Sequence, residues 1–166
     1  GIRELDQFAS AIVQLSRENE EVTALERRRI EHERDYDTLT GLYRRRAFDR
    51  ACEALFQQPE KLGCAALLMM DLDNLKHIND TYGHDVGDQL LKAVSCRLRT
   101  CVRSTDYAFR IGGDEFVVFL KDIPNTTLLQ KTRQLSESVQ QVKFWENDYR
   151  MTCSIGACFL PENTAG

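Results

Sequence analysis

The segment CAALLMMDLD, residues 64–73, decides the fold of this chain. Its first seven residues are all apolar, and Asp71 and Asp73 follow almost immediately. An apolar run of this length between polar flanks predicts a β-strand buried on both faces, which requires a sheet covered by helices. The strand would therefore carry two carboxylates to its carboxyl end.

Helices are predicted on both sides of this strand. After it, residues 74–82 suit a short helix that Gly83 interrupts, and a longer helix would run to about residue 103. The apolar residues of the longer helix have i, i+4 spacing: Val86, Leu90, Val94 and Leu98. Before the strand, residues 37–46 lack a helical period and indicate a loop. A helix with one apolar face follows that loop: Ala47, Phe48, Ala51 and Leu55.

The second half of the chain predicts more strands. Residues 107–111 and 116–120 are short apolar segments joined across Gly112 and Gly113, which favours a β-hairpin because glycine supplies the positive φ of tight turns. Residues 125–143 have a helical seam, and strands are expected near 144–149 and 151–159. After the first helix the order is α β α α β β α β β. This order predicts an α/β or α+β sandwich with a mixed central sheet flanked by helices.

Residues 1–35 differ from the rest, because they are rich in Glu and Arg and have no proline or internal glycine. Their apolar residues follow a 3-4 heptad spacing until Leu25 breaks the register: Leu5, Phe8, Ile12, Leu15 and Val22. A narrow seam needs a partner helix, and Asn19 in a core slot sets register, so we expect a parallel coiled-coil homodimer. A helix packed on its own domain is the alternative. The expected organisation is a signalling helix over 1–35 and a globular domain over 36–166.

Composition limits the classes of partner. The net charge of −4 argues against nucleic acid and an anionic membrane, but allows a nucleotide whose charge a metal ion offsets. Six cysteines without a CxxC pair are typical of small buried residues in a reducing cytosol. No apolar stretch reaches about 18 residues and no signal peptide is visible, so we expect a cytoplasmic segment. A membrane anchor or sensor upstream of Gly1 stays open.

Two acidic pairs stand at predicted strand ends. Asp71 and Asp73 end the buried strand, and Asp114 and Glu115 follow the Gly-Gly turn. Carboxylates are rarely buried unpaired, and hard oxygen ligands select Mg²⁺ or Mn²⁺. Glycines beside them would let a triphosphate approach the backbone. The layout therefore favours phosphoryl or nucleotidyl transfer, with a solvent-facing acidic hairpin as the alternative.

The residues around these acids resemble the GGDEF family of diguanylate cyclases. The signature itself is RIGGDEF at residues 110–116, and four further blocks occur in the family's order: DTLTGL at 37–42, DLDNLKHINDTYGH at 71–84, Gly87-Asp88, and SIG at 154–156. The resemblance runs from Asp37 to the end of the chain. It implies a palm-like, nucleotidyl-cyclase-like fold and the condensation of two GTP molecules into cyclic di-GMP with release of pyrophosphate.

The resemblance also implies roles for the acidic residues. Asp71, the backbone carbonyl of Leu72, and Asp114 would hold Mg²⁺ or Mn²⁺. Asp114 would also be placed to accept the proton of the attacking 3′-hydroxyl, a role open to either carboxylate. Glu115 would support a second metal or its ligands. Gly112 and Gly113 would lie against the substrate.

Four residues between the two acidic pairs are implied in GTP binding. Asn79 and Asp88 would read the guanine edge, because a carboxylate accepts from N1–H and N2–H₂, a pair of donors that adenine lacks. Lys76 and His84 would contact the phosphates or the sugar. A solvated lysine at Lys76 and a helix cap at His84 are the alternatives.

Catalysis in this family needs two domains, since each 3′-hydroxyl attacks the other GTP. The coiled-coil helix would raise the local concentration of the second domain.

Arg103 and Asp106 match the family's RxxD inhibitory site for cyclic di-GMP, where the Arg stacks on guanine and the Asp also contacts the ligand. A surface ion pair is the alternative.

The sequence departs from the family pattern in three places. Arg44 and Arg45 stand where the family has Asn then Arg, which affects the local turn, and Leu75 replaces the usual Phe. The family's last helix, with a Lys and an Arg for the GTP phosphates, has no counterpart before Gly166, so weaker GTP binding and slower turnover are expected. A receptor for GTP or cyclic di-GMP without catalysis, and a dimerising signalling scaffold, are the competing functions.

Overall fold

The predicted central strand, β2 (Ala65–Leu72), pairs with a neighbour on each side in the computed structural model of this chain. The structure describes residues 1–61, 63–143 and 150–161. It divides into two compact units, Gly1–Asp35 and Tyr36–Gly166.

The sheet of the second unit has five strands in the order β1-β3-β4-β2-β5. The other strands are β1 (Tyr43–Arg44), β3 (Tyr107–Arg110), β4 (Glu115–Lys121) and β5 (Cys153–Leu160). β1 runs parallel to β3, while the pairs β3–β4, β4–β2 and β2–β5 are antiparallel. The mixed sheet and its helices confirm the predicted fold class.

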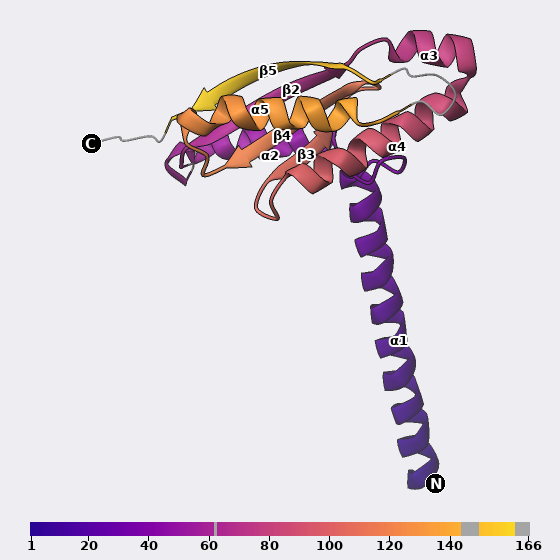
Figure 1. Ribbon diagram of the computed structural model, residues 1–166. Helices are drawn as coiled ribbons and strands as arrows, with labels where there is room; N and C mark the ends of the chain where they lie inside the picture. The colour runs from indigo at the N-terminus through magenta and orange to yellow at the C-terminus, as the bar shows by residue number, and fades with distance from the viewer. Residues whose placement is uncertain (62, 144–149, 162–166) are drawn as a thin grey trace. The chain divides into compact units, whose positions relative to one another are not determined.

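Three helices follow or flank β2 as the periodicity predicts (Figure 1). They are α3 (Leu75–Tyr82), α4 (His84–Cys101) and α5 (Asn125–Gln140). A further helix, α2 (Arg45–Gln57), precedes β2, with the short 3₁₀ turn η1 (Pro59–Lys61) between them. Gly83 separates α3 from α4 with a φ of 95°, a conformation that glycine adopts without steric cost.

The main core lies between one face of the sheet and helices α4 and α5. Leu68 and Met70 of β2 pack there with Val94 and Leu98 of α4 and with residues of α5. A smaller cluster forms on the other face, where Ala47 of α2 meets buried residues of β3 and β4.

Burial of β2 on both faces was predicted, and this is wrong for its second half. Met69 is 52% exposed and Asp71 is exposed, whereas Met70 and Leu72 are buried. Side chains alternate along a strand, and the described part of the other face is covered mainly over β3 and β4. The second half of β2 is therefore buried on one face only, although the sequence is apolar at successive positions up to Met70.

Two further predictions need correction. Residues 37–46 are not all loop, because β1 occupies Tyr43–Arg44 and α2 begins at Arg45. Neither Gly112 nor Gly113 has a positive φ, so the hairpin turn does not depend on that conformation. The helix after Gly83 ends at Cys101, within two residues of its predicted end. The strand expected at 144–149 lies outside the described residues.

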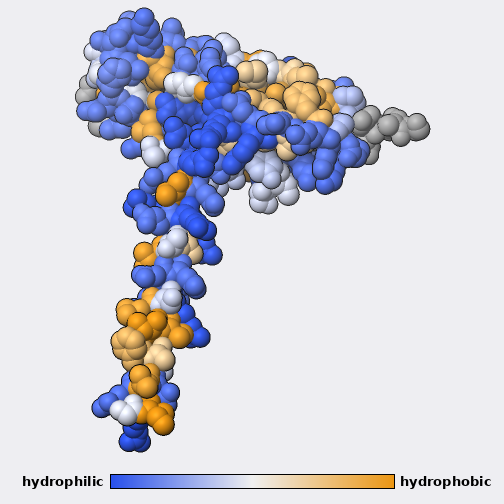
Figure 2. All heavy atoms as spheres, turned by 180° about the vertical axis from the view of Figure 1, so that it is seen from behind, coloured by the Kyte–Doolittle hydropathy of each residue, from blue (hydrophilic) through white to orange (hydrophobic). Residues whose placement is uncertain are grey.

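The first unit is the single helix α1 (Ile2–Asp35), which has no buried residue. The side chains of all five seam residues are at least half exposed, from 50% at Ile12 to 68% at Leu5. Hydrophobic side chains gather along the part of α1 nearest the N-terminus (Figure 2). Among the described residues, no helix has the length and apolarity to cross a membrane.

Candidate active site

The register of β2 and β4 brings three carboxylates to one point. Asp71 is the cross-strand partner of Glu115, and the backbone N–H of Leu72 donates to the carbonyl of Asp114 at 3.0 Å. One ligand oxygen from each of Asp71, Asp114 and Glu115 lies within 4.8 Å of the others. Three of the four carboxylates at the two predicted strand ends therefore lie together, and Asp73 is not in this group.

The electrostatics of this cluster suit a cation. Like charges directly opposite on antiparallel strands destabilise a sheet. Although Asp71 is exposed, desolvation by neighbouring protein atoms raises the pKa of its carboxyl, and repulsion from Asp114, Glu115 and Asp73 raises it further. A divalent metal would reverse that repulsion, and carboxylate oxygens are the donors that Mg²⁺ and Mn²⁺ prefer. The Leu72 side chain is buried and has no ligand atom, so this residue could bind a metal only through its backbone carbonyl.

Asp73, which shares the end of β2 with Asp71, has a different environment. Its carboxylate accepts hydrogen bonds from the hydroxyls of Thr152 at 2.8 Å and Ser154 at 3.0 Å. Its backbone N–H donates to the carbonyl of Thr152 at 2.9 Å. Asp73 thus fastens the end of β2 to β5, a role that its spacing in the sequence did not reveal.

The Gly-Gly turn leaves room for the acidic side chains. A Cβ on Gly112 would lie 2.9 Å from Oε2 of Glu115 and 3.3 Å from its Cβ. Nothing lies within 4 Å of a Cβ on Gly113, which is exposed. Any side chain at position 112 would thus require Glu115 to shift, whereas position 113 has open space.

Arg110 connects this turn to the start of the second unit, which sequence reasoning missed. Its guanidinium donates to the Gly113 carbonyl at 2.9 Å and to the Asp37 carboxylate at 3.2 Å. Burial alone would raise the pKa of Asp37, but hydrogen bonds from Thr40 and Arg110, with the Arg110 charge, lower it. The quoted signature contains Arg110, yet only the fold shows its partner 73 residues away.

The residues implied in nucleotide binding lie on α3 and α4. Lys76, His84 and Asp88 are exposed. Asn79 is half-buried, and its Oδ1 is buried without a hydrogen-bond partner among the described residues. α3 begins three residues after β2 ends and α4 follows across Gly83, so these residues come directly after the strand that carries Asp71.

Arg103 and Asp106 form a close pair at the turn before β3. Arg103 donates to the Asp106 carboxylate from Nε and from a terminal nitrogen, each at 3.2 Å, and also to the Lys121 carbonyl. The backbone N–H groups of Arg103 and Lys121 donate to the same carboxylate at 2.9 and 3.0 Å. The Asp106 side chain is fully buried, while that of Arg103 is 54% exposed. Asp106 thus holds Arg103 and leaves part of it open to solvent.

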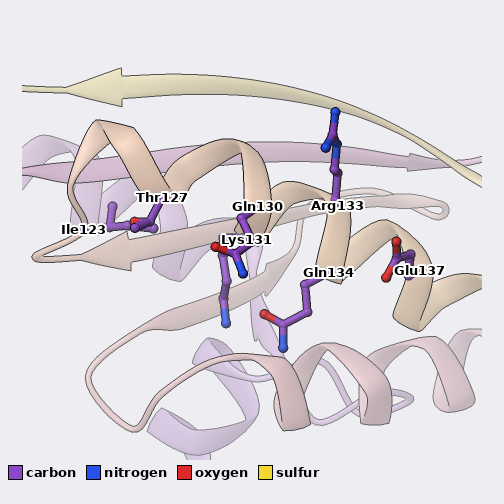
Figure 3. A pocket seen from close by; sticks show the side chains of 7 residues that line it. All are labelled: Ile123, Thr127, Gln130, Lys131, Arg133, Gln134 and Glu137. Carbon is purple, nitrogen blue, oxygen red and sulfur yellow. The ribbon is translucent and has the colours of Figure 1, made fainter.

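A hollow of about 570 Å³ lies over α5 and not at the acidic cluster (Figure 3). Lys131, which lines it, donates to the carbonyl of Cys101 at the end of α4. The hollow is lined by Ile123, Thr127, Gln130, Lys131, Arg133, Gln134 and Glu137. None of these residues was predicted as a site residue.

Comparison with known proteins agrees with this geometry. Residues 34–165 match the family described as diguanylate cyclase, GGDEF domain. The diguanylate cyclase DgcS of Shewanella oneidensis is 38% identical over 128 residues, which are 76% of this chain and 43% of that protein. Diguanylate cyclase DgcM of Escherichia coli K12 is 40% identical over 130 residues, 76% of this chain and 31% of that protein.

Solved structures share the fold. The coiled coil and GGDEF domain of DgcB from Caulobacter crescentus, solved in complex with c-di-GMP, aligns with a TM-score of 0.73 at 25% identity. The alignment covers 92% of this chain and 84% of that one. The fold is thus shared with a solved GGDEF domain, and this chain belongs to the GGDEF diguanylate cyclase family. It spans less than half the length of DgcS and DgcM.

Proposed function

We propose that this chain is a catalytically competent diguanylate cyclase domain, which joins two GTP molecules into cyclic di-GMP and releases pyrophosphate. The observation that carries the proposal is the convergence of Asp71, Asp114 and Glu115 beside the Gly112 turn. A receptor without catalysis would not need three mutually repelling carboxylates at one sheet edge. Their electrostatic cost is explained if the cluster binds a metal–triphosphate complex.

Asp71, the carbonyl of Leu72, and Asp114 would hold Mg²⁺ or Mn²⁺, and Glu115 would support a second ion or its ligands. When bound, the metal would withdraw charge from the α-phosphate. Asp114 or Asp71 would accept the proton of the 3′-hydroxyl, as either can if it lies within hydrogen-bond reach. Gly112 and Gly113 would let the phosphates approach the backbone of the turn.

GTP would be selected by α3 and α4. The Asp88 carboxylate would accept from N1–H and N2–H₂ of guanine, and the Asn79 amide would pair with the same edge of the base. Lys76 and His84 would contact the phosphates or the sugar. Lys76 and Asn79 lie on α3 and His84 and Asp88 on the first turns of α4, the two helices that follow β2 in the chain, which supports a substrate site continuous with the acidic cluster.

The reaction would take place between two copies of the chain. Each domain would bind one GTP, and each 3′-hydroxyl would attack the α-phosphorus of the other molecule. The exposed seam of α1 supports a homodimer, because paired helices would raise the effective concentration of the second domain. The protein would then contribute to catalysis mainly by positioning the two GTP molecules.

Arg103 and Asp106 would form an inhibitory site for the product. Asp106 already anchors the Arg103 guanidinium, and its exposed part would stack on and hydrogen-bond a guanine of cyclic di-GMP. Because Asp106 is buried, its own contact with the ligand would need a local shift, and its main contribution would be to fix Arg103. Inhibition at this site would make synthesis self-limiting.

Incubation of the purified chain with GTP and Mg²⁺, with nucleotides separated by chromatography, tests the proposal. Cyclic di-GMP and two pyrophosphates per product are expected, and ATP should give no cyclic dinucleotide. A parallel reaction with the Asp71→Asn variant controls for a contaminating cyclase. If the chain binds GTP or cyclic di-GMP but forms no product over a range of concentrations, the receptor function replaces this proposal.

A further inference from the structure

The side chain of Asn79 on α3 rests directly on the backbone of Gly87 on α4. A Cβ built on Gly87 would lie 1.7 Å from Oδ1 of Asn79 and 2.9 Å from its Cγ, inside the space that the amide occupies. The φ of Gly87 is not in the left-handed region, so the backbone itself does not require glycine there. The amide of Asn79 is therefore what excludes a side chain at position 87.

Packing of α3 against α4 does not explain why this amide is present. Oδ1 of Asn79 is the one buried side-chain nitrogen or oxygen atom that lacks a hydrogen-bond partner within residues 1–61, 63–143 and 150–161. An unpaired buried acceptor costs free energy, and an apolar side chain of similar shape would avoid that cost. Glycine inside a helix also costs free energy relative to alanine. The unpaired Oδ1 of Asn79 and the helical Gly87 are both unfavourable for stability, and they lie in contact, which indicates a ligand.

We propose that Gly87 is a positioning residue for base recognition, which acts by giving the Asn79 amide its place beside Asp88. The inference rests on the proposed function and deepens it. Guanine offers donors at N1–H and N2–H₂, and a carboxamide that is not tied to the protein can turn to pair with that edge. Any side chain at position 87 would displace the Asn79 amide away from α4. Asp88 is the next residue on α4, so the amide would also be displaced from Asp88.

Direct binding measures this role without turnover. The ligand is α,β-methylene GTP with Mg²⁺, because the methylene bridge of this analogue blocks pyrophosphate release. Titration calorimetry would compare its binding to wild type, Gly87→Ala, Asn79→Ala and the double variant. Each single change should weaken binding about tenfold, the loss expected for about one hydrogen bond. In the Asn79→Ala background, Gly87→Ala should change the affinity by less than about twofold, because the amide it displaces is gone.

Thermal unfolding without nucleotide tests the contact itself. Gly87→Ala should lower the unfolding midpoint when Asn79 is present, because the Cβ and the amide cannot share one space. In the Asn79→Ala background the same change should raise the midpoint, because alanine favours a helix more than glycine does. This reversal of sign can be measured even if Gly87→Ala alone folds poorly. Asn79→Ala alone should not lower the midpoint, since it breaks no hydrogen bond of Oδ1.

Gly156→Ala is the matched control, because a Cβ there has nothing within 4 Å and the φ of Gly156 is not in the left-handed region. It should bind the analogue as wild type does. Wild-type affinity in Gly87→Ala, or independent and additive losses from the two single changes, would overturn the inference while leaving the proposed function intact. A lower midpoint for Gly87→Ala in both backgrounds would also overturn it. A wild-type chain that binds no analogue would overturn the proposed function, and this inference with it.

Discussion

Asp71 and Asp114 reach the same point from neighbouring strands, yet neither contributes to the core. Asp71 is exposed, and Asp114 is only half-buried. Their carboxylates repel one another, so neutralising one of them removes repulsion and breaks no packing contact. Function and stability are therefore expected to respond in opposite directions at these residues.

We predict that Asp71→Asn and Asp114→Asn each lower cyclic di-GMP formation by at least about a hundredfold, because each removes a metal ligand. The unfolding midpoint should stay the same or rise. Product formation from GTP and Mg²⁺, together with thermal unfolding, measures both effects. Asp49→Asn, an exposed carboxylate on α2, is the control and should keep wild-type activity. Near-normal activity in either site variant would remove that residue from the metal site.

Asp88 is expected to decide between guanine and adenine. Its carboxylate would pair with two donors of guanine, and facing adenine it would be left unpaired at a cost of roughly 1–3 kcal/mol. Asp88→Ala should therefore reduce the preference for GTP over ATP by about tenfold or more in competition binding. Gln89→Ala, at the next exposed position of α4, should leave the preference unchanged. An unaltered preference in Asp88→Ala would mean that another residue reads the base.

At the scale of elements, two carboxylates, those of Asp37 and Asp106, tie segments that are distant in the sequence. Arg110 links the turn before β1 to the Gly-Gly turn, through Asp37 and the Gly113 carbonyl. Asp106 links the turn after α4 to the end of β4, through backbone N–H groups of Arg103 and Lys121. Both carboxylates accept several hydrogen bonds, which outweigh the effect of burial and lower their pKa.

Asp106 makes the stability of this unit dependent on pH in the acid range. Its pKa is lowered in the folded state, so its contribution is complete above the unfolded value of about 3.9 and is lost as pH falls through the folded value. Asp106→Asn should lower the free energy of unfolding by about 1–3 kcal/mol at pH 7, because buried donors lose their charged acceptor. The difference from wild type should shrink below about pH 4.

Urea unfolding of wild type and Asp106→Asn at pH 7, 5 and 3 measures this effect, with Asp49→Asn as the exposed control. A stability difference between wild type and the Asp106 variant that stayed constant from pH 7 to 3 would contradict the assignment. The same variant should also weaken inhibition by cyclic di-GMP, since Arg103 would lose its anchor.

At the scale of the whole molecule, α1 is a helix whose apolar residues are not buried within one chain. Its 34 residues would extend about 50 Å at roughly 1.5 Å per residue, with an exposed apolar seam along much of that length. Asn19 interrupts the seam, and the register changes near Leu25. A coiled coil with such a break would allow an upstream signal to change the relative rotation of two domains.

We predict that Leu15→Asp lowers dimer content and lowers specific activity most at low protein concentration, because it places a charge in the seam. Ser10→Asp, on the opposite side of the heptad, is the matched control and should leave both unchanged. Light scattering and activity over a dilution series measure the effect. A monomeric wild type with concentration-independent specific activity would rule out dimerisation through α1 as part of catalysis.

Local patterns in the sequence were sufficient for much of the fold and for the acidic site. An apolar run that ends in Asp71 predicted β2, and the glycine pair predicted the hairpin that delivers Asp114. The periods of apolar residues predicted α1, α4 and α5 to within a few residues at their ends. These features depend on neighbours in the chain, because strand and helix periodicity are properties of short segments.

Contacts between distant segments were decided only by the tertiary structure. The one-sided exposure of β2, the bonds of Asp73 to Thr152, and the place of the Asn79 amide on Gly87 all depend on which faces pack together. Strand register and helix packing set these contacts, and a shift of one residue would turn every strand side chain to the other face. Local apolar patterns thus predicted the strands that carry the acidic residues, and the packing and register of those strands set how Asp71, Asp114 and Glu115 meet.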